Sequence, residues 1–169
     1  MKKIFKDFIG NFFERALSTL AFIFPFVEVS TYFGPKVFLA SDSAVLKTFY
    51  VNYIAKLTAF YTENIYVVFI LMVWIFITCS RGSAPLTKFV RFNVIQAILL
   101  NIICTCLGFI FNYLPVVLRE SMIGAVFSNF LYLGIILLIA YSSLLIAYGR
   151  YPKIPVISEA AKLQVQQGS

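Results

Sequence analysis

Long uncharged stretches rich in apolar residues alternate with short charged segments along this chain. The clearest of these stretches are residues 65–80, 92–117 and 122–149. A helix needs about 20 mostly apolar residues to cross the ~30 Å hydrocarbon layer of a bilayer. The last two stretches exceed that length, and the first approaches it once the four residues before it are added. The pattern therefore predicts membrane-spanning helices over 61–80, 90–114 and 122–149.

A weaker apolar segment precedes these three. Residues 16–27 carry no charge, but they are too few for a span and Glu28 follows them directly. On length alone the segment could be re-entrant or interfacial. An extension to 12–33 gives a full span with Glu28 near one end, where its carboxylate can reach headgroups or water. We expect this span, and the Gly34-Pro35 pair predicts its end.

Residues 42–62, between the first two predicted spans, form an amphipathic pattern. At 100° per residue, leucines and aromatic residues fall on one arc and small polar residues fall opposite. This predicts a helix lying in the membrane interface on the side away from the termini. The alternative is a helix packed on the protein's own spans. The aromatic residues of the arc are Phe49, Tyr50, Tyr53, Phe60 and Tyr61.

Composition supports one membrane domain. The chain has 169 residues, of which 61% are hydrophobic and 12% charged, whereas a soluble domain is usually about 25% charged. The predicted fold is an all-α membrane protein covering residues 1–169, with four spans, the interfacial helix and a tail over 150–169. The net charge of +7 does not indicate nucleic acid, because Lys and Arg accumulate in membrane-protein loops on the side of synthesis.

The distribution of basic residues predicts the orientation. With four spans, both termini lie on one side, and 10 of the 14 Lys and Arg residues fall on that side. The other four, which lie opposite, are Lys36, Lys47, Lys56 and Arg119. Both termini are therefore expected to face the compartment in which the protein is made.

Polar residues inside the predicted spans are the candidate functional residues. They are Asn93, Gln96, Asn101, Thr105 and Asn112 on the third span, Asn129 and Ser143 on the fourth, and Glu28 on the first. An amide in hydrocarbon needs a partner, so these residues must meet another helix, a subunit or water. Two interpretations stay open: contacts between helices, or the wall of a hydrated path.

Catalytic and metal chemistry have little support in the sequence. The chain contains no histidine, and its three cysteines lie in or beside apolar stretches. No pairing of a nucleophile with a base and no phosphate-binding loop is present. We therefore expect no catalytic, metal or cofactor site and no enzymatic activity.

Three segments resemble a known family. The stretch 89–100, which reads Phe-Val-Arg-Phe-Asn-Val-Ile-Gln-Ala-Ile-Leu-Leu, is similar to the signature segment of the 20-kDa subunit of the Tic translocon. That translocon imports proteins across the chloroplast inner envelope. Residues 14–26 resemble the family's first span, and residues 151–161 resemble its C-terminal tail. The resemblance is weakest in the aromatic-rich loop between the first two spans.

The resemblance implies a function and a location. It implies four helices with both termini in the stroma, and a channel-forming role for unfolded preproteins delivered by the Toc complex of the outer envelope. The implied partners are other Tic subunits, the Toc complex, preproteins in transit and membrane lipid, with no nucleic acid. The location would be the plastid inner envelope for a plastid-encoded member, or the bacterial inner membrane for a cyanobacterial one.

Two other functions remain alongside the translocation path. The chain could be a structural scaffold that holds larger subunits, its amides serving only to join helices. It could also be a small-solute permease in a bacterial inner membrane.

Overall fold

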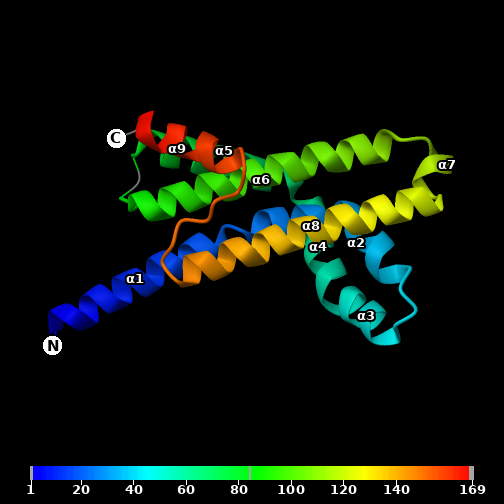
Figure 1. Cartoon of the computed structure of the whole chain (residues 1–169), viewed down its shortest axis with the longest axis horizontal. Helices are drawn as coiled ribbons and strands as arrows, with labels where there is room; N and C mark the ends of the chain where they lie inside the picture. Colours follow the sequence, from blue (N-terminus) through cyan, green and yellow to red (C-terminus); the bar gives the residue numbers. More distant parts are fainter. Residues whose placement is uncertain (1, 84, 168–169) are drawn as a thin grey trace.

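The described part of the chain is built from helices. A computed structural model covers residues 2–83 and 85–167, and these residues form helices joined by short turns. Figure 1 shows long helical runs lying along one direction, formed by α1 (Lys2–Leu20) with α2 (Ile23–Leu39), by α6 (Lys88–Tyr113) and by α8 (Met122–Ala147). Both termini lie toward one end of these runs, and α7 (Val116–Arg119) lies at the other. The prediction of an all-α membrane protein is confirmed.

Three of these runs have the length and hydropathy of membrane spans. They are Gly10–Leu39, Lys88–Tyr113 and Met122–Ala147. A fourth span arises if Ala44–Glu63 and Ile65–Arg81 are counted together, although the two segments meet at a bend of 80°. The structure therefore holds three to four membrane-spanning helices by length and composition.

The first span is longer than the sequence predicts. Helix α2 continues through Gly34 and Pro35 to Leu39, so the prediction that it ends at this pair is wrong. Proline removes one backbone donor, but a span packed among neighbouring helices tolerates this loss. Glycine at position 34 has a packing role, because a Cβ there would lie 3.0 Å from the ring of Tyr50. This close approach holds the segment between the first two spans against α2.

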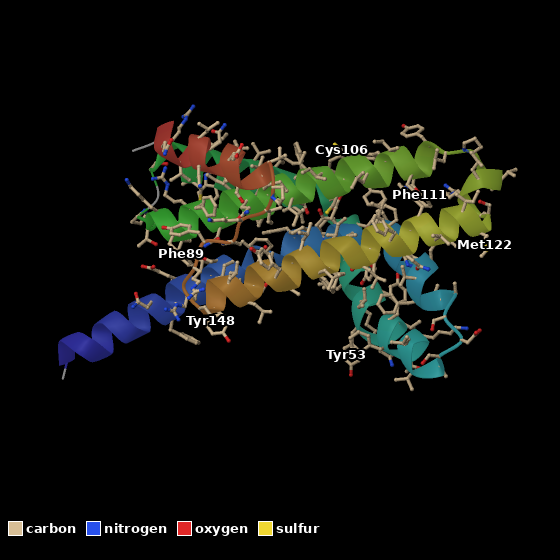
Figure 2. The ribbon with its side chains drawn as sticks, in the orientation of Figure 1. Tyr53, Phe89, Cys106, Phe111, Met122 and Tyr148 are labelled. Atoms are coloured by element: carbon tan, nitrogen blue, oxygen red, sulfur yellow. The ribbon has the colours of Figure 1, made fainter. Side chains whose placement is uncertain are left out.

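That segment forms an arm, which comprises α3 (Ala44–Phe49), the π-helical turn η1 (Tyr50–Ile54) and α4 (Ala55–Glu63). Figure 1 shows the arm standing at an angle to the long helices. Of the five aromatic residues predicted to share one arc, Tyr50 and Tyr61 are buried, whereas the other three are exposed. A π-helical turn holds more residues than an α-helical one, so η1 rotates the second half of the arc away from the first. Part of the arm therefore packs on the protein's own spans, and part is exposed as an interfacial helix would be. Figure 2 shows Tyr53 at the outer side of the arm.

Helix α2 occupies the centre of the bundle, between α6 on one side and α8 on the other. Helices α5 (Ile65–Arg81) and α9 (Ile157–Gln167) pack against α6. Most of α5 is exposed, including Trp74 at 63%, which suits a helix that faces lipid. The N-terminal half of α6 is buried on all sides, because α1, α2, α5 and α9 surround it.

Candidate functional site

The polar and small residues of α6 line one buried face. Asn93, Gln96 and Asn101 are at most 2% exposed, and Thr105 is partly buried. The side-chain oxygens of the three amides have no hydrogen-bond partner among the described residues. A buried acceptor without a partner is costly, so this face retains the capacity to bind a donor. Asn112, the last polar residue of the predicted stripe, is exposed near the end of α6.

A polar cluster joins α2, α4 and α6 at the middle of the bundle. Glu28 of α2 is 3% exposed, and the Thr105 hydroxyl donates to its Oε1 at 2.6 Å. The Tyr61 hydroxyl, from the arm, interacts with Glu28 and with the side chain of Asn101. Within the described ranges, no Lys or Arg forms an ion pair with Glu28. An ionisable group so placed marks a candidate functional site, which is built here by hydroxyl and amide groups.

The sequence did not predict the role of Tyr61 in this cluster. It placed Tyr61 on the aromatic arc of the arm and Glu28 near the end of a span. The 80° bend between the arm and α5 folds Tyr61 inward against α2 and α6. The spacing of Glu14, Ser18, Ala21, Pro25 and Glu28 places them on one arc of the first span. All of them except Glu14 are buried, which puts Glu28 on the packed side, but this spacing gives no signal for Tyr61.

On α8 the buried polar residues are not those predicted. Asn129 is exposed and Ser143 is only partly buried, whereas Ser128 and Ser142 are fully buried. Each predicted residue lies one position, or about 100°, past the buried one. The packing of Tyr132 onto α2, where its hydroxyl lies 3.4 Å from that of Ser30, fixes the rotation of α8. The structure thus places Asn129 and Ser143 away from the Glu28 cluster.

Gln96 connects α6 to the C-terminal tail. Its Nε2 donates to the Ser158 hydroxyl at 2.9 Å, and Ser80 donates to Gln164 of α9 at 2.9 Å. Tyr151 packs edge-on against the rings of Phe89 and Phe92 of α6. The tail is therefore fixed to α5 and α6 through polar contacts, and Gln96 belongs to this junction rather than to the Glu28 cluster.

Two arginines at the same end of the bundle cap the C-termini of helices. Arg91, which is 5% exposed, donates to the carbonyl oxygens of Cys79 and Ser80 at the end of α5. Arg15 donates to the carbonyl of Ala147 at the end of α8. Cations stabilise the last carbonyls of a helix and its dipole. From the sequence, both arginines were counted only as basic residues that set the orientation. A count of charges contains no information on side-chain contacts between helices, so these caps were not predicted.

Charged groups also tie the opposite end of the bundle together. Lys36 at the end of α2 donates to Glu120 at 3.2 Å and to the carbonyl of Arg119. The Lys36 ammonium lowers the pKa of the Glu120 carboxyl below its usual value, and Arg119 adds to this effect. The turn that carries α7 is therefore fastened to α2.

Two grooves open on the outer surface of α5 and α6. One, of about 320 Å³, lies between α5 and α6 and is lined by Asn101 and Thr105 together with apolar side chains such as Phe69 and Ile102. The other, of about 530 Å³, lies among the α1–α2 junction, the C-terminal half of α5 and the N-terminal half of α6, and its lining is almost entirely apolar. In the first groove the exposed lining is almost entirely apolar, and the buried Asn101 and the partly buried Thr105 lie among the lining residues.

The described ranges contain no cluster of side chains suited to binding a metal ion. Residues 2–83 and 85–167 contain no group of three or more Cys, Asp or Glu side chains able to hold a metal ion. Cys79 and Cys104 are buried free thiols, and Cys106 is an exposed one. The arrangement offers hydrogen-bond donors and acceptors inside a membrane-embedded bundle.

Comparison with known proteins places this geometry in a family. A family profile described as "Chloroplast import apparatus Tic20-like" matches residues 9–161. A Tic20 family protein Ycf60 from Cyanidium caldarium is 28% identical over 162 residues, which cover 96% of this chain and 78% of the relative. The Ycf60 protein of Gracilaria tenuistipitata is 31% identical over 155 residues, covering 90% and 75%.

A relative from Synechocystis sp., named Tic20 family protein, is 30% identical over 154 residues, covering 90% of this chain and 93% of the relative. The matched region includes all the predicted spans, the Glu28 cluster and most of the tail. Together with the apolar helices, these matches indicate a membrane component of protein transport in a plastid or cyanobacterial membrane. The chain belongs to the Tic20 family.

Proposed function

We propose that this chain is a membrane-embedded subunit of a protein-import translocon in the chloroplast inner envelope, and that it supplies one wall of the path for unfolded preproteins. The observation that carries the proposal is the family match over residues 9–161. The proposed partners are other Tic subunits, the Toc complex of the outer envelope and preproteins in transit. Both termini are proposed to face the stroma, in keeping with the excess of basic residues on that side.

The surface groove between α5 and α6 is the proposed position of this wall. An extended polypeptide in hydrocarbon has backbone donors that need acceptors. Asn101 Oδ1 is buried without a partner, and Asn101 and Thr105 both line the groove. A bundle this narrow cannot enclose a polypeptide, since α2 fills its centre. The path would therefore run beside the chain and be completed by another subunit.

The other candidate polar residues receive different proposed roles. Asn93 and Gln96 are fully buried and would join α6 to its neighbours and to the tail. Asn112, Asn129 and Ser143 lie at or near the surface of the bundle, where they could meet partner subunits.

The burial of the amide side chains on α6 also supports the alternative function, a scaffold. If Asn93, Gln96 and Asn101 only join helices, the chain holds other subunits in place and touches no preprotein. This alternative also places the chain in the translocon, so the two readings differ only in contact with the moving polypeptide. In a cyanobacterium the same chain would lie in the inner membrane.

Depletion tests the proposed function. In plastids with reduced levels of this chain, preproteins should still bind at the outer envelope, but their arrival in the stroma should fall in proportion to the depletion. Re-expression of the full chain should restore arrival. Unchanged import after depletion would contradict both the path and the scaffold. A defect confined to uptake of a small solute would support a permease instead.

A further inference from the structure

The membrane-facing surfaces of this molecule differ in height from one side to the other. Helix α5 has 17 residues, and α8 on the opposite side of α2 has 26. At 1.5 Å per residue these helices measure about 25 Å and about 39 Å. A typical hydrocarbon layer is about 30 Å thick. Helix α8 exceeds this thickness, whereas α5 falls about 5 Å short of it.

Polar residues mark both ends of the short side. Arg81 is the last residue of α5, and Glu63 and Asn64 come directly before its first residue. Glu63 is exposed, and within the described ranges its side chain forms no ion pair or hydrogen bond. An exposed carboxylate without a partner needs water or lipid headgroups around it.

The depth of Glu63 follows from its neighbour Tyr61. The Tyr61 hydroxyl meets Glu28 and Asn101, and Asn101 is close to the midpoint of α6, which runs from Lys88 to Tyr113. The chain bends by 80° directly after α4. Glu63 is therefore held near the level of the buried Glu28, well inside the height spanned by α6 and α8.

On the far side the same level is apolar. Tyr132 of α8 contacts Ser30, which is half a turn from Glu28, and the next residue, Leu133, is 56% exposed. Helix α8 carries no charged residue along its whole length. At one level of the molecule, therefore, one side presents a free carboxylate and the other presents leucine to the surroundings.

We propose that the bilayer is locally thinned beside α4 and α5, so that water and lipid headgroups reach Glu63 and Asn64 while α8 faces a bilayer of full thickness. Lipid adjusts to a short hydrophobic surface by thinning at modest cost. Apolar side chains of the arm, such as Phe60 at 65% exposure, would rest on the thinned surface. This interaction with lipid is independent of the proposed role in import.

Trp74 provides an internal reporter, since it is the single tryptophan of the chain and is 63% exposed on α5. The full chain is placed in vesicles that mix brominated phosphatidylcholine of fourteen-carbon chains with unbrominated lipid of twenty-two-carbon chains, or the reverse pair. Quenching of fluorescence gives the relative occupancy of each lipid at α5. The matched control is the W74F/L133W variant, which moves the reporter to the exposed face of α8.

The wild-type chain should favour the short lipid by about twofold or more, and the control variant should show no such preference. A second measurement uses nitroxide labels on Glu63→Cys and Leu133→Cys, with the native cysteines replaced by alanine. Collision with a water-soluble nickel complex should be at least about tenfold more frequent at position 63 than at position 133. Equal lipid preference on the two sides, or equal nickel access at the two positions, would overturn the proposal.

Discussion

At the residue scale, the central feature is a carboxylate inside the bundle that forms no ion pair with a described Lys or Arg. Glu28 is held by Thr105 and Tyr61, which come from two different helices. Interhelical hydrogen bonds inside membranes average about 0.6 kcal/mol and reach about 1.7 kcal/mol. Loss of one partner leaves a buried group unsatisfied, which costs more than the bond contributes. The cluster therefore stabilises the contact between the arm and the central helices.

Substitutions in this cluster should destabilise the folded chain. Tyr61→Phe should lower the free energy of unfolding by about 0.6–1.7 kcal/mol, and Glu28→Ala by about 1–3 kcal/mol because two hydroxyls lose their acceptor. Unfolding followed by circular dichroism in mild detergent measures both changes. Tyr53→Phe is the control, since Tyr53 is 67% exposed and its loss should change nothing. Equal effects at positions 53 and 61 would show that the cluster contributes no stability.

Glycines distinguish close packing from open surface within the spans. At Gly108 of α6 a Cβ would lie 2.3 Å from the Tyr32 ring, whereas at Gly134 of α8 nothing lies within 4 Å. Gly108→Ala should push α2 from α6 and cost about 1–3 kcal/mol. Gly134→Ala should be neutral or stabilise the helix by up to about 1 kcal/mol. Thermal unfolding of the two variants measures this difference, and similar midpoints would contradict the packing described here.

At the element scale, the ends of the helices hold the bundle together. Arg15 and Arg91 cap α8 and α5 at the terminal end, and Lys36 joins α2 to the turn before α8 at the other. The contacts of Arg15 and Lys36 link elements that are far apart in sequence, and that of Arg91 joins the consecutive helices α5 and α6. They explain how short connections such as the one carrying α7 stay in place against the long helices.

The contact at Glu120 predicts a pH dependence. Since Lys36 lowers the pKa of Glu120 in the folded chain, the contact is fully formed above the ordinary glutamate pKa of about 4.3. It is lost as the pH falls through the lower folded value. Lys36→Met should raise the pKa of Glu120 toward the ordinary value, and Lys47→Met, on the arm, should not. Carbon-detected NMR titration of labelled glutamate measures both, and an unchanged pKa in Lys36→Met would refute the contact.

The sequence predicted where the helices lie better than it predicted which faces of those helices are buried. On α6 the spacing places Asn93, Ala97, Asn101, Cys104, Gly108 and Asn112 on one stripe, and all of them except Asn112 are buried. Ile95, which a repeat of 100° per residue places on the opposite side of α6, is also buried, and both α5 and α9 pack against α6. Periodicity reports one helix at a time and contains no information on what covers its second face.

The arm shows a second limit of sequence reasoning. Its helical pattern was recognisable, but the π-helical turn at Tyr50 and the bend after Glu63 cannot be read from a regular 100° repeat. These two irregularities decide that Tyr61 points inward and Tyr53 outward. On α8 the spacing places Asn129, Tyr132 and Ser143 on one face. Tyr132 is buried against Ser30, but the buried serines are Ser128 and Ser142.

At the scale of the whole molecule, a closed bundle with unequal sides stands in a membrane with both termini at one end. Figure 2 shows Phe89 and Tyr148 toward that end and Met122 toward the other. Central α2 leaves no room for a polypeptide through the bundle, so any path must run along an outer surface. The groove between α5 and α6 is such an outer surface, with Asn101 and Thr105 among an otherwise apolar lining.

The orientation of the whole chain can be measured separately. Three helices have the length and composition of spans, and the arm together with α5 would make a fourth. With four spans the two termini lie on the same side, so epitope tags at the two termini should behave alike. With four spans, both tags should be protected from protease added to intact inner-envelope vesicles whose stromal side faces inward. Protection of only one tag would mean that the arm and α5 together do not cross the membrane.

The central claim is that the chain lines a preprotein path along the α5–α6 groove. A photoreactive amino acid at Ile102, which lines the groove and is 51% exposed, is compared with one at Leu133, which is 56% exposed on α8. With a preprotein arrested in transit, illumination should crosslink it to position 102 and leave position 133 free. Equal crosslinking at both positions, crosslinking at position 133 alone, or none at either while import is arrested, would contradict the claim.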